Sequence, residues 1–489
     1  MLTAIVFLPL VGALAVLVAR NDRGVRLTAL VAALGDLVLA AWAFAKYQTG
    51  GERFQLLDGP FRWIPALNSH YLLGVDGLSA PMVLLTGLLG LSAVLVSWSV
   101  KTRVKEYFVW LLVLQTSVMG VFTSLDFVLF FLFWELELIP MYLLIAVWGS
   151  GRKEYSAMKF LTFTLLGSAF MLVAIVVLYL GTGGFDMREL SAAGAIDAKA
   201  LLLPVQAVFW FFFVAFAIKL PSFPVHTWLP DAHTDAPTAV SVMLAGVLLK
   251  MGGYGIIRVM VGMFPEQTHQ YAWVLAVLGA VSVLYGAVVT LRQTDLKRLV
   301  AYSSVSHMGL VLLGVSTVGL KAPSAVGLTG ASLQMFTHGT ITGLLFLLVG
   351  LTYERAHTRY IPDLGGLASR MPFIAVAFLV AGLASLGLPG LSGFAAELLV
   401  FLGAFSAFPW AAALSAFGIV LAAGYILWMA QRVFFGPARP RFDKLRDATA
   451  MEMVAPALLI ASIVVVGVYP AVLTDVFKAG LEPMLKVFG

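Results

Sequence analysis

The chain has 489 residues, of which 61% are hydrophobic and only 11% are charged, and its formal net charge is +6. Soluble globular proteins carry about 25% charged residues, so this composition excludes an ordinary soluble domain and indicates a polytopic membrane protein. The sequence contains no cysteine, which excludes disulfides, thiol catalysis and cysteine-ligated iron–sulfur clusters within this chain. The positive charge is typical of basic cytoplasmic loops, and we expect no nucleic-acid partner.

Apolar stretches of membrane-spanning length recur along the whole chain. A spanning helix needs about 20 mostly apolar residues, and by this measure the sequence predicts about fourteen spans. The first stretch, MLTAIVFLPLVGALAVLVAR, lacks a basic n-region and a cleavage site, so we interpret it as a retained span rather than a signal peptide. The predicted spans begin near Leu2, Leu27, Leu78, Phe108, Phe127, Ala157, Val205, Ala236, Ala272, Leu299, Val326, Ile374, Ala411 and Ala455.

The distribution of basic residues predicts the orientation. Most of the 31 Lys and Arg residues fall on the connections from odd-numbered to even-numbered spans, and two, Lys219 and Lys250, fall inside spans. Cytoplasmic loops carry the excess of Lys and Arg in membrane proteins. We therefore expect both termini on the external side.

Two groups of five predicted spans have corresponding interruptions. Residues 108–262 hold spans 4–8 and residues 270–435 hold spans 9–13, with three spans before them in residues 1–107 and a last one in residues 453–489. The seventh span is broken at Pro221 and Pro224, and the twelfth at Pro389 and Gly390. Paired broken helices are typical of inverted-repeat transporters. The predicted fold is a single all-α polytopic membrane domain with two inverted five-helix repeats and broken helices 7 and 12.

Ionisable residues lie deep inside the predicted spans. Lys219 lies about 14 residues into the seventh span, hence roughly 21 Å along it. Pro221 opens the helix there, and opened backbone at that depth is tolerated only against protein or a wet cavity. The other members at similar depth are Glu135, Lys250, His307, His338 and Glu397. Each charge at the bilayer centre costs about 2.5–3.5 kcal/mol. We therefore interpret the set as a mid-membrane proton path.

Each member of this set also has a structural interpretation. Glu135 and Lys219 can form a static ion pair between helices, and Lys250 can extend towards an interface. The two histidines can hydrogen-bond neighbouring Ser or Thr hydroxyls, and Glu397 can cap the second half of its broken span. These alternatives stay open at the level of sequence.

Two other acidic stretches are left outside the path. Glu137 lies about 200° around a regular helix from Glu135 and is expected to face a partner subunit or to be protonated. The stretch WLPDAHTDAPT contains Asp231, His233 and Asp235, a spacing that resembles a metal-ligand cluster. Turn chemistry and capping of the following span explain it better, and we expect no metal site.

Several long motifs resemble the antiporter-like membrane subunits of respiratory complex I, and most closely the subunit M or chain 4 type. They are FWELELIPMYLLIAVWG, FAIKLPSFPVHTWLPDAHTDAPT, LKRLVAYSSVSHMG and SLGLPGLSGFAAE. The resemblance implies fourteen helices with inverted repeats. It places the family's functional positions on Glu135, Lys219, Lys250, His307, His338 and Glu397. Glutamate rather than lysine at the last position favours subunit M over the L and N relatives.

The resemblance implies a function and partners. The chain is expected to be a proton-translocating subunit of NADH:quinone oxidoreductase in a bacterial inner membrane, surrounded by lipid and by the L- and N-type antiporter-like subunits. NADH, FMN, iron–sulfur clusters and quinone are expected in partner subunits, with no cofactor site or redox centre in this chain. Two alternatives remain: a Na⁺/H⁺ antiporter subunit of the Mrp type, which uses the same residues without redox drive, and a structural subunit that pumps nothing.

Overall fold

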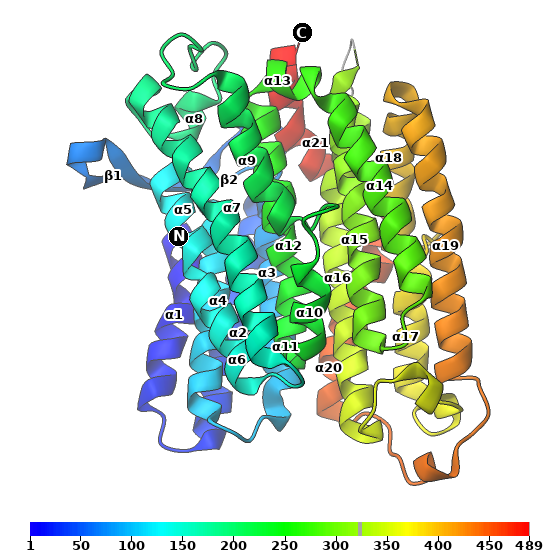
Figure 1. The fold of residues 1–489 in the computed structure, drawn as a ribbon. Coiled ribbons are helices and arrows are strands. Elements are labelled where there is room, and N and C mark those ends of the chain that lie inside the picture. Colours follow the sequence, from blue (N-terminus) through cyan, green and yellow to red (C-terminus); the bar gives the residue numbers. More distant parts are fainter. Residues whose placement is uncertain (321–324, 489) are drawn as a thin grey trace.

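Eleven helices are long and apolar enough to cross a membrane within residues 1–320 and 325–488, the part of the chain that the computed structural model describes (Figure 1). They are α2 (Asp22–Lys46), α3 and η2 (Ser79–Val96, Ser97–Ser99), α4 (Val104–Thr123), α5 and α6 (Phe127–Leu136, Leu138–Trp148), α7 (Lys153–Thr182), α11, η3, α12 and η4 (Thr238–Met243, Leu244–Leu248, Leu249–Gly255, Ile256–Val261), α14 (Ala272–Leu291), α15 and η5 (Leu296–Val315, Ser316–Gly319), α16 (Ala325–Ala356), α19 (Pro409–Val433) and α20 (Ala450–Val468).

Four apolar helices are shorter: α1 (Leu2–Val18), α9 (Val205–Lys219), α17 (Pro372–Ser385) and α18 (Ser392–Ala407). The prediction of a helical polytopic membrane protein is confirmed, although the chain also contains one β-hairpin. The count of fourteen spans stays a prediction, because these helices have fewer residues than the roughly 20 that a single straight span requires.

The helix breaks fall at prolines and glycines. α9 ends at Lys219, and helical structure resumes only with α10 (Trp228–Asp235); Pro221 and Pro224 lie between them. A second interruption separates α17 from α18 and contains Pro389 and Gly390. Proline removes a backbone donor and clashes with the preceding turn, which ends each helix.

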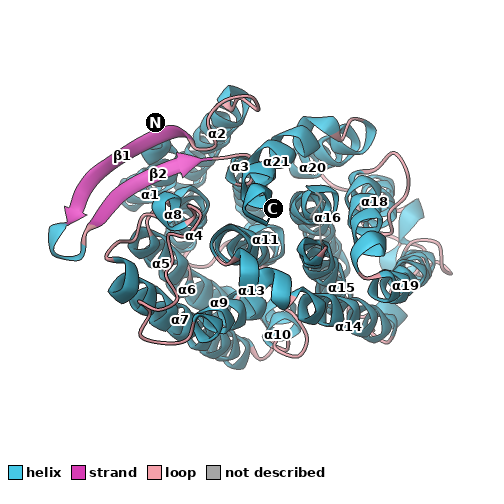
Figure 2. Ribbon diagram, turned by 90° about the horizontal axis from the view of Figure 1, so that it is seen from above, coloured by secondary structure: helices cyan, strands magenta, loops and turns pink. Residues whose placement is uncertain are grey.

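The centre of the bundle is formed by two long helical segments. The most apolar stretches of α11–η4 and of α16 are completely buried, against 33% of α2 and 28% of α20. Figure 2 shows α11 and α16 in the middle of the bundle, surrounded by the other helices. The central helices carry Lys250 and His338, so these two residues are removed from lipid.

A β-hairpin, which the sequence analysis did not predict, follows α2. Strands β1 (Gln55–Ile64) and β2 (Ser69–Val75) are antiparallel, with Phe61 opposite Tyr71. Figure 2 shows the hairpin along one edge of the bundle, beside α1. Asn68 takes a left-handed backbone conformation (φ 52°) at the turn, which asparagine tolerates better than most residues.

A buried ion pair fixes the junction between this hairpin and α3. The Asp76 carboxylate accepts two hydrogen bonds from the Arg258 guanidinium, both 2.6 Å long, and the two side chains are 0% and 2% exposed. The same carboxylate accepts the Ser79 N–H at the start of α3. Burial alone would raise the pKa of Asp76, but its bonds to Arg258 and the charge of the nearby Arg53 hold that pKa below the ordinary value of 3.8.

The last long helical element, α21 (Ala471–Leu485), packs against this junction. A Cβ atom at Gly77 would lie 2.0 Å from the Val476 carbonyl and 2.5 Å from the Gly480 nitrogen. Only glycine allows backbones to approach so closely. The hairpin, the start of α3 and α21 therefore form one tightly packed end of the molecule.

Candidate functional site

Lys219, the last residue of α9, is buried and forms an ion pair with Glu137. The two side chains are 1% and 0% exposed. The ammonium also lies 5.5 Å from the ring centroid of Trp134 and 5.6 Å from that of Phe160, within the range of cation–π interactions. The pair is therefore enclosed by aromatic side chains and shielded from lipid.

This pairing corrects the sequence analysis, which placed Glu135 opposite Lys219 and left Glu137 out. The argument assumed a regular helix, but α5 ends at Leu136 and α6 begins at Leu138. Pro140 lacks the N–H that would bond the Leu136 carbonyl, which loosens this turn. Glu135 remains close enough for its charge to act on Lys219, and its buried Oε1 has no hydrogen-bond partner within the described residues.

Lys250 lies at the centre of the molecule in α12. Its ammonium donates a hydrogen bond to the Ala245 carbonyl and lies 2.7 Å from Nδ1 of His338 on α16. The segments before and after α12, η3 and η4, are π-helical. Wide turns of this kind leave carbonyls outside the regular ladder and are frequent at functional sites. The π-turn thus supplies the acceptor that holds Lys250.

Close backbone packing brings α12 against the end of α9. A Cβ atom at Gly252 would lie 2.6 Å from both the Leu220 nitrogen and the Phe216 carbonyl. Glycine is required for such an approach. Because Leu220 follows Lys219 directly and Gly252 follows Lys250 by two residues, this contact joins the two helices that carry the lysines.

His307 links the central helices to the second break. Its ring centroid lies 5.4 Å from that of His338. Its Nδ1 is 2.7 Å from the Ser303 carbonyl and its Nε2 is 2.9 Å from the Ser385 carbonyl, the last residue of α17. Both partners only accept hydrogen bonds, so both contacts are satisfied when each ring nitrogen carries a proton. The Glu397 carboxylate, 3.8 Å from Nε2, can balance the resulting charge.

Glu397 lies in the second turn of α18, directly inside the break. The side chain is 6% exposed, and a Cβ atom at Gly387 would lie 2.5 Å from its Oε2. Gly387 has a φ of +75°, a conformation that favours glycine. Nearby, the buried Tyr425 hydroxyl of α19 has no hydrogen-bond partner in the described part of the chain. The segment between α17 and α18 therefore packs directly against the Glu397 carboxylate.

His233 is a candidate that the sequence analysis assigned to capping. Its ring is 0% exposed and stacks on Phe346 at 4.3 Å, and neither nitrogen has a hydrogen-bond partner among the described residues. The charges of Lys250 and Lys297 act on it. Its neighbours in the sequence, Asp231, Thr234 and Asp235, are polar and gave no signal of a buried position.

The acids flanking His233 point elsewhere. Asp231 pairs with Lys159 at 2.7 Å and with Arg298 at 3.3 Å, while Asp235 accepts a hydrogen bond from the Ser156 hydroxyl at 2.6 Å. The expectation that they cap the following span is wrong, because α11 begins after Pro237 without a side-chain cap. Across residues 1–320 and 325–488, no group of three or more His, Cys, Asp or Glu residues is arranged to hold a metal ion.

Comparisons with known sequences agree with the resemblance of the motifs. The family model for "NADH:quinone oxidoreductase/Mrp antiporter, TM" matches residues 124–422. NAD(P)H-quinone oxidoreductase chain 4 1 of Synechococcus sp. (strain JA-3-3Ab) is 43% identical over 488 residues, covering 97% of this chain and 91% of the relative. NADH-quinone oxidoreductase subunit M of Rhodobacter capsulatus is 42% identical over 501 residues, covering 99% and 96%.

Solved structures share the fold. A chain of respiratory complex I from Thermus thermophilus matches with a TM-score of 0.90 at 30% identity, covering 100% of both chains. A chain of the Mrp complex from Dietzia sp. DQ12-45-1b matches with a TM-score of 0.86 at 23% identity, covering 99% of this chain and 98% of that one, which shows the fold alone. From sequence and structure together, the chain belongs to the NADH:quinone oxidoreductase/Mrp antiporter transmembrane family.

Proposed function

We propose that the chain is a proton-translocating membrane subunit of an NADH:quinone oxidoreductase. The observation that supports this most directly is the buried series of titratable side chains running from the first helix break to the second. It comprises Glu137, Lys219, Lys250, His338, His307 and Glu397. In this proposal NADH, FMN, iron–sulfur clusters and quinone belong to partner subunits, and other antiporter-like subunits of the L and N type are neighbours in the membrane.

The contacts suggest the order of the second half of the path. A proton leaves the Lys250 ammonium for Nδ1 of His338, with which it is already in hydrogen-bond distance. His307, which carries a proton on each ring nitrogen, first gives its Nε2 proton to the Glu397 carboxylate 3.8 Å away. The proton that His338 releases then replaces it on His307. In the first half, electron transfer in partner subunits shifts the Glu137–Lys219 pair. A change in that pair alters the field at Lys250 through the close contact between α9 and α12.

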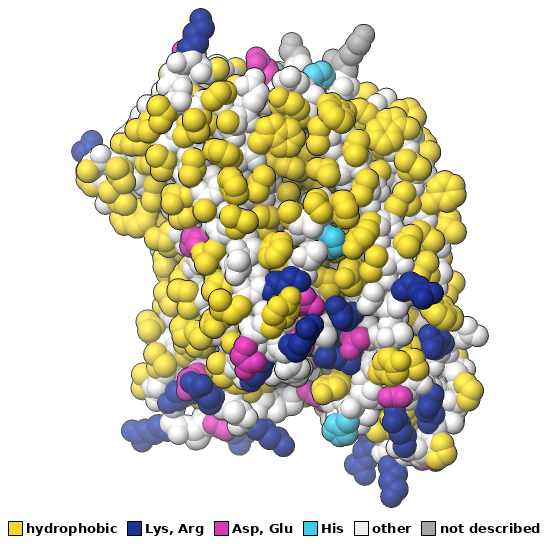
Figure 3. All heavy atoms as spheres, viewed as in Figure 1, with side chains coloured by type: hydrophobic (Ala, Val, Ile, Leu, Met, Phe, Trp, Pro, Cys, Tyr) yellow, Lys and Arg dark blue, Asp and Glu magenta, His cyan; other side chains and the backbone are white. Residues whose placement is uncertain are grey.

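The orientation and the repeats are part of the same proposal. We infer that both termini lie on the external side of a bacterial inner membrane. Figure 3 supports this, because dark-blue Lys and Arg side chains gather at the lower end of the view, beneath a broad hydrophobic surface. We also infer that residues 108–262 and 270–435 are inverted repeats, each with one broken helix. Their breaks fall after Lys219 and before Glu397, at the two ends of the buried series.

Replacing the terminal acid tests the proposal. Glu397→Gln keeps the shape of the side chain but removes its proton-carrying group. The rate of proton transfer through this subunit is expected to fall by about 10²-fold or more, the usual contribution of a positioned acid or base. The measurement is NADH-driven acidification of vesicles that contain the intact complex, with NADH oxidation followed in parallel.

Glu266→Gln, at an exposed position of α13 (Pro265–Gln270), is the matched control and should pump normally. Unchanged pumping in Glu397→Gln would remove this residue from the path. Sodium-dependent proton exchange by vesicles without NADH or quinone would instead favour an antiporter of the Mrp type. If the complex pumps normally after every member of the buried series has been replaced, this chain is a structural subunit that does not translocate protons.

A glycine substitution tests the packing of the segment between α17 and α18 against Glu397. Gly387→Ala is expected to impair pumping, because the new Cβ would meet the Glu397 carboxylate at 2.5 Å. A non-glycine residue at positive φ adds about 1–2 kcal/mol of backbone strain. Gly390→Ala separates the two effects: Gly390 has φ +89°, and its Cβ would have no atom within 4 Å. Equal pumping by the two variants, measured by vesicle acidification, would show that the clash has no functional effect.

A further inference from the structure

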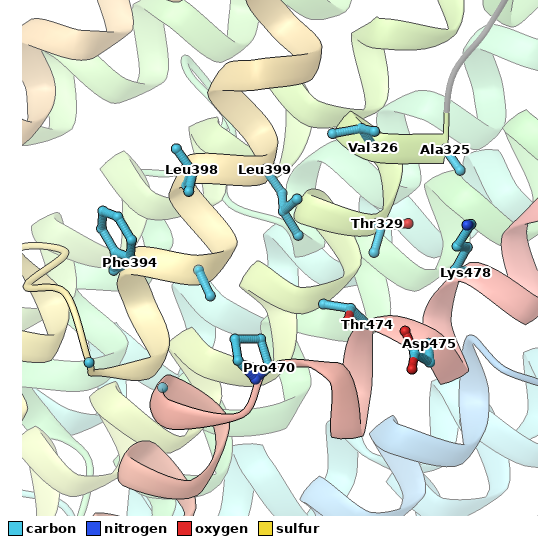
Figure 4. Close-up of a pocket in the computed structure, with 13 residues that line it drawn as sticks. Ala325, Val326, Thr329, Phe394, Leu398, Leu399, Pro470, Thr474, Asp475 and Lys478 are labelled. Atoms are coloured by element: carbon cyan, nitrogen blue, oxygen red, sulfur yellow. The ribbon is translucent and has the colours of Figure 1, made fainter.

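A cavity of about 480 Å³ lies outside the buried series, between α16, α18 and α21. Figure 4 shows its lining side chains. The residues that form it are Ala325, Val326, Thr329, Gly390, Phe394, Ala395, Leu398, Leu399, Gly467, Pro470, Thr474, Asp475 and Lys478. Its size falls within the range of about 300–1,000 Å³ that is usual for small-ligand sites.

The cavity is located where a spanning helix ends. α20 stops at Val468, and the exposed Tyr469 follows it, with 65% of its surface accessible. α21 has only 15 residues, too few to cross a bilayer. Tyrosine and short amphipathic helices are typical of the membrane–water interface. Gly467 packs against Gly390, so α20 ends level with the second helix break. Lys478 lies nine residues beyond Tyr469, roughly 14 Å further along, and the α21 end of the cavity therefore lies nearer to the lipid headgroups.

The lining is divided between a polar and an apolar end. In Figure 4, Thr329, Asp475 and Lys478 lie on one side, and Phe394 and Leu398 on the other. The charges at the polar end are one cation and one anion, three residues apart on α21. A ligand that complements both carries a cation and an anion of its own together with an apolar chain.

We propose that this cavity binds a zwitterionic glycerophospholipid with an amine headgroup, of the phosphatidylethanolamine type. The phosphate pairs with Lys478, and the ammonium pairs with Asp475. One acyl chain enters between α16 and α18, where it contacts Phe394 and Leu398. An anionic lipid or free phosphate would leave Asp475 facing a like charge, which disfavours both.

The occupant would contact the second helix break. Gly390 and Phe394 line the cavity, and Glu397 lies on the same helix, less than one turn beyond Phe394, with its side chain buried on the inner side. Gly467 of α20 packs directly against the break, because a Cβ atom at this position would lie 2.4 Å from the Gly390 carbonyl. The lipid therefore steadies the first turn of α18. This regulatory role rests on the proposed function, whereas the binding site does not.

Photo-crosslinking of the intact complex tests the site. The complex is reconstituted in vesicles that contain phosphatidylethanolamine with a photoreactive acyl chain, and labelled peptides are identified by mass spectrometry. We expect labelling of α18 and α21, and loss of that labelling in Ala395→Trp, which fills the cavity. Ala461→Trp, at an exposed position of α20 away from the cavity, is the matched control and should keep it.

A second variant tests the headgroup without affecting the core. Lys478 is 59% exposed and pairs with Glu482 at 3.6 Å. Lys478→Glu is expected to reduce labelling by phosphatidylethanolamine, whereas Glu482→Gln, which removes the same ion pair outside the cavity, should not. A photoreactive phosphatidylglycerol should label the wild type more weakly, and excess inorganic phosphate should not compete.

Three results would overturn the inference. They are equal labelling by the two lipids, unchanged labelling in Ala395→Trp, and a crosslink from the cavity to a neighbouring subunit in place of lipid. Pumping by Glu397→Gln is measured separately. Loss of pumping without lipid labelling therefore refutes only the lipid site, and labelling with normal pumping by Glu397→Gln refutes only the proton path.

Discussion

Lys219→Ala is expected to abolish or sharply reduce proton translocation while the complex still assembles. The substitution leaves Glu137 buried with no cation, and removal of one partner from a buried ion pair costs about 3–5 kcal/mol. The variant should therefore also unfold at a lower temperature than the wild type. The measurements are the proton-to-electron ratio in vesicles oxidising NADH and the thermal unfolding midpoint of the purified complex.

A double variant distinguishes a Glu137–Lys219 pair that takes part in proton transfer from one that only stabilises the fold. Lys219→Met combined with Glu137→Leu removes both charges, and apolar replacement of a whole buried pair is often neutral or stabilising. Stability should return in this variant but pumping should not. A wild-type proton-to-electron ratio in Lys219→Ala, or in the double variant, would contradict a role in proton transfer.

Double-mutant cycles test whether Glu137 or Glu135 is the partner of Lys219. In double-mutant cycles with Lys219→Met, Glu137→Gln should show a larger coupling energy than Glu135→Gln, because Glu137 forms the ion pair. Equal couplings would mean that the two carboxylates share the lysine.

Arg258→Met is expected to destabilise the end of the molecule that holds the β-hairpin and α21 by about 3–5 kcal/mol, because it leaves the Asp76 carboxylate buried and unpaired. The loss should appear as a lower thermal unfolding midpoint and as faster proteolysis of the β-hairpin. Arg53→Met is the matched control: Arg53 lies 4.0 Å from the same carboxylate and is 19% exposed, so its loss should cost much less.

The pH dependence of this pair follows from the lowered pKa of Asp76. A carboxylate whose pKa is lower in the folded protein stabilises the fold fully above its ordinary value of 3.8, and this contribution is lost as the pH falls through the lower, folded value. The difference in stability between wild type and Asp76→Asn should therefore be constant near neutral pH and shrink below pH 3.8. A difference that grows on acidification would assign the stabilisation to another group.

The burial of five of the six ionisable residues was predictable from the sequence, because an apolar run leaves a lysine few ways to reach water; the sixth, Glu135, is partly buried. Lys219, Lys250, His307, His338 and Glu397 are all buried in the structure. The positions of the breaks followed from proline and glycine chemistry. These inferences depend only on local sequence and on the thickness of the membrane.

The partners of those residues were not predictable, because they depend on deviations from regular helix geometry. The irregular turn at Glu137 makes this residue, rather than Glu135, the ion-pair partner of Lys219. A π-turn provides the carbonyl that accepts a hydrogen bond from Lys250. His233 was assigned to a turn because its polar neighbours suggested one, whereas packing against Phe346 places it in the interior. The β-hairpin was missed because β1 is largely exposed, contains Gly59 and Pro60, and has no clean alternation of apolar residues.

The two π-turns that bound α12 have a mechanical consequence. An α-helix advances about 100° per residue, and a π-turn accommodates one extra residue that can be passed along the chain. Transfer of the extra residue from the turn before α12 to the turn after it would rotate α12 by about 100° between fixed ends, without unwinding the span. Such a rotation would separate Lys250 from Nδ1 of His338 and so interrupt the buried series at its centre.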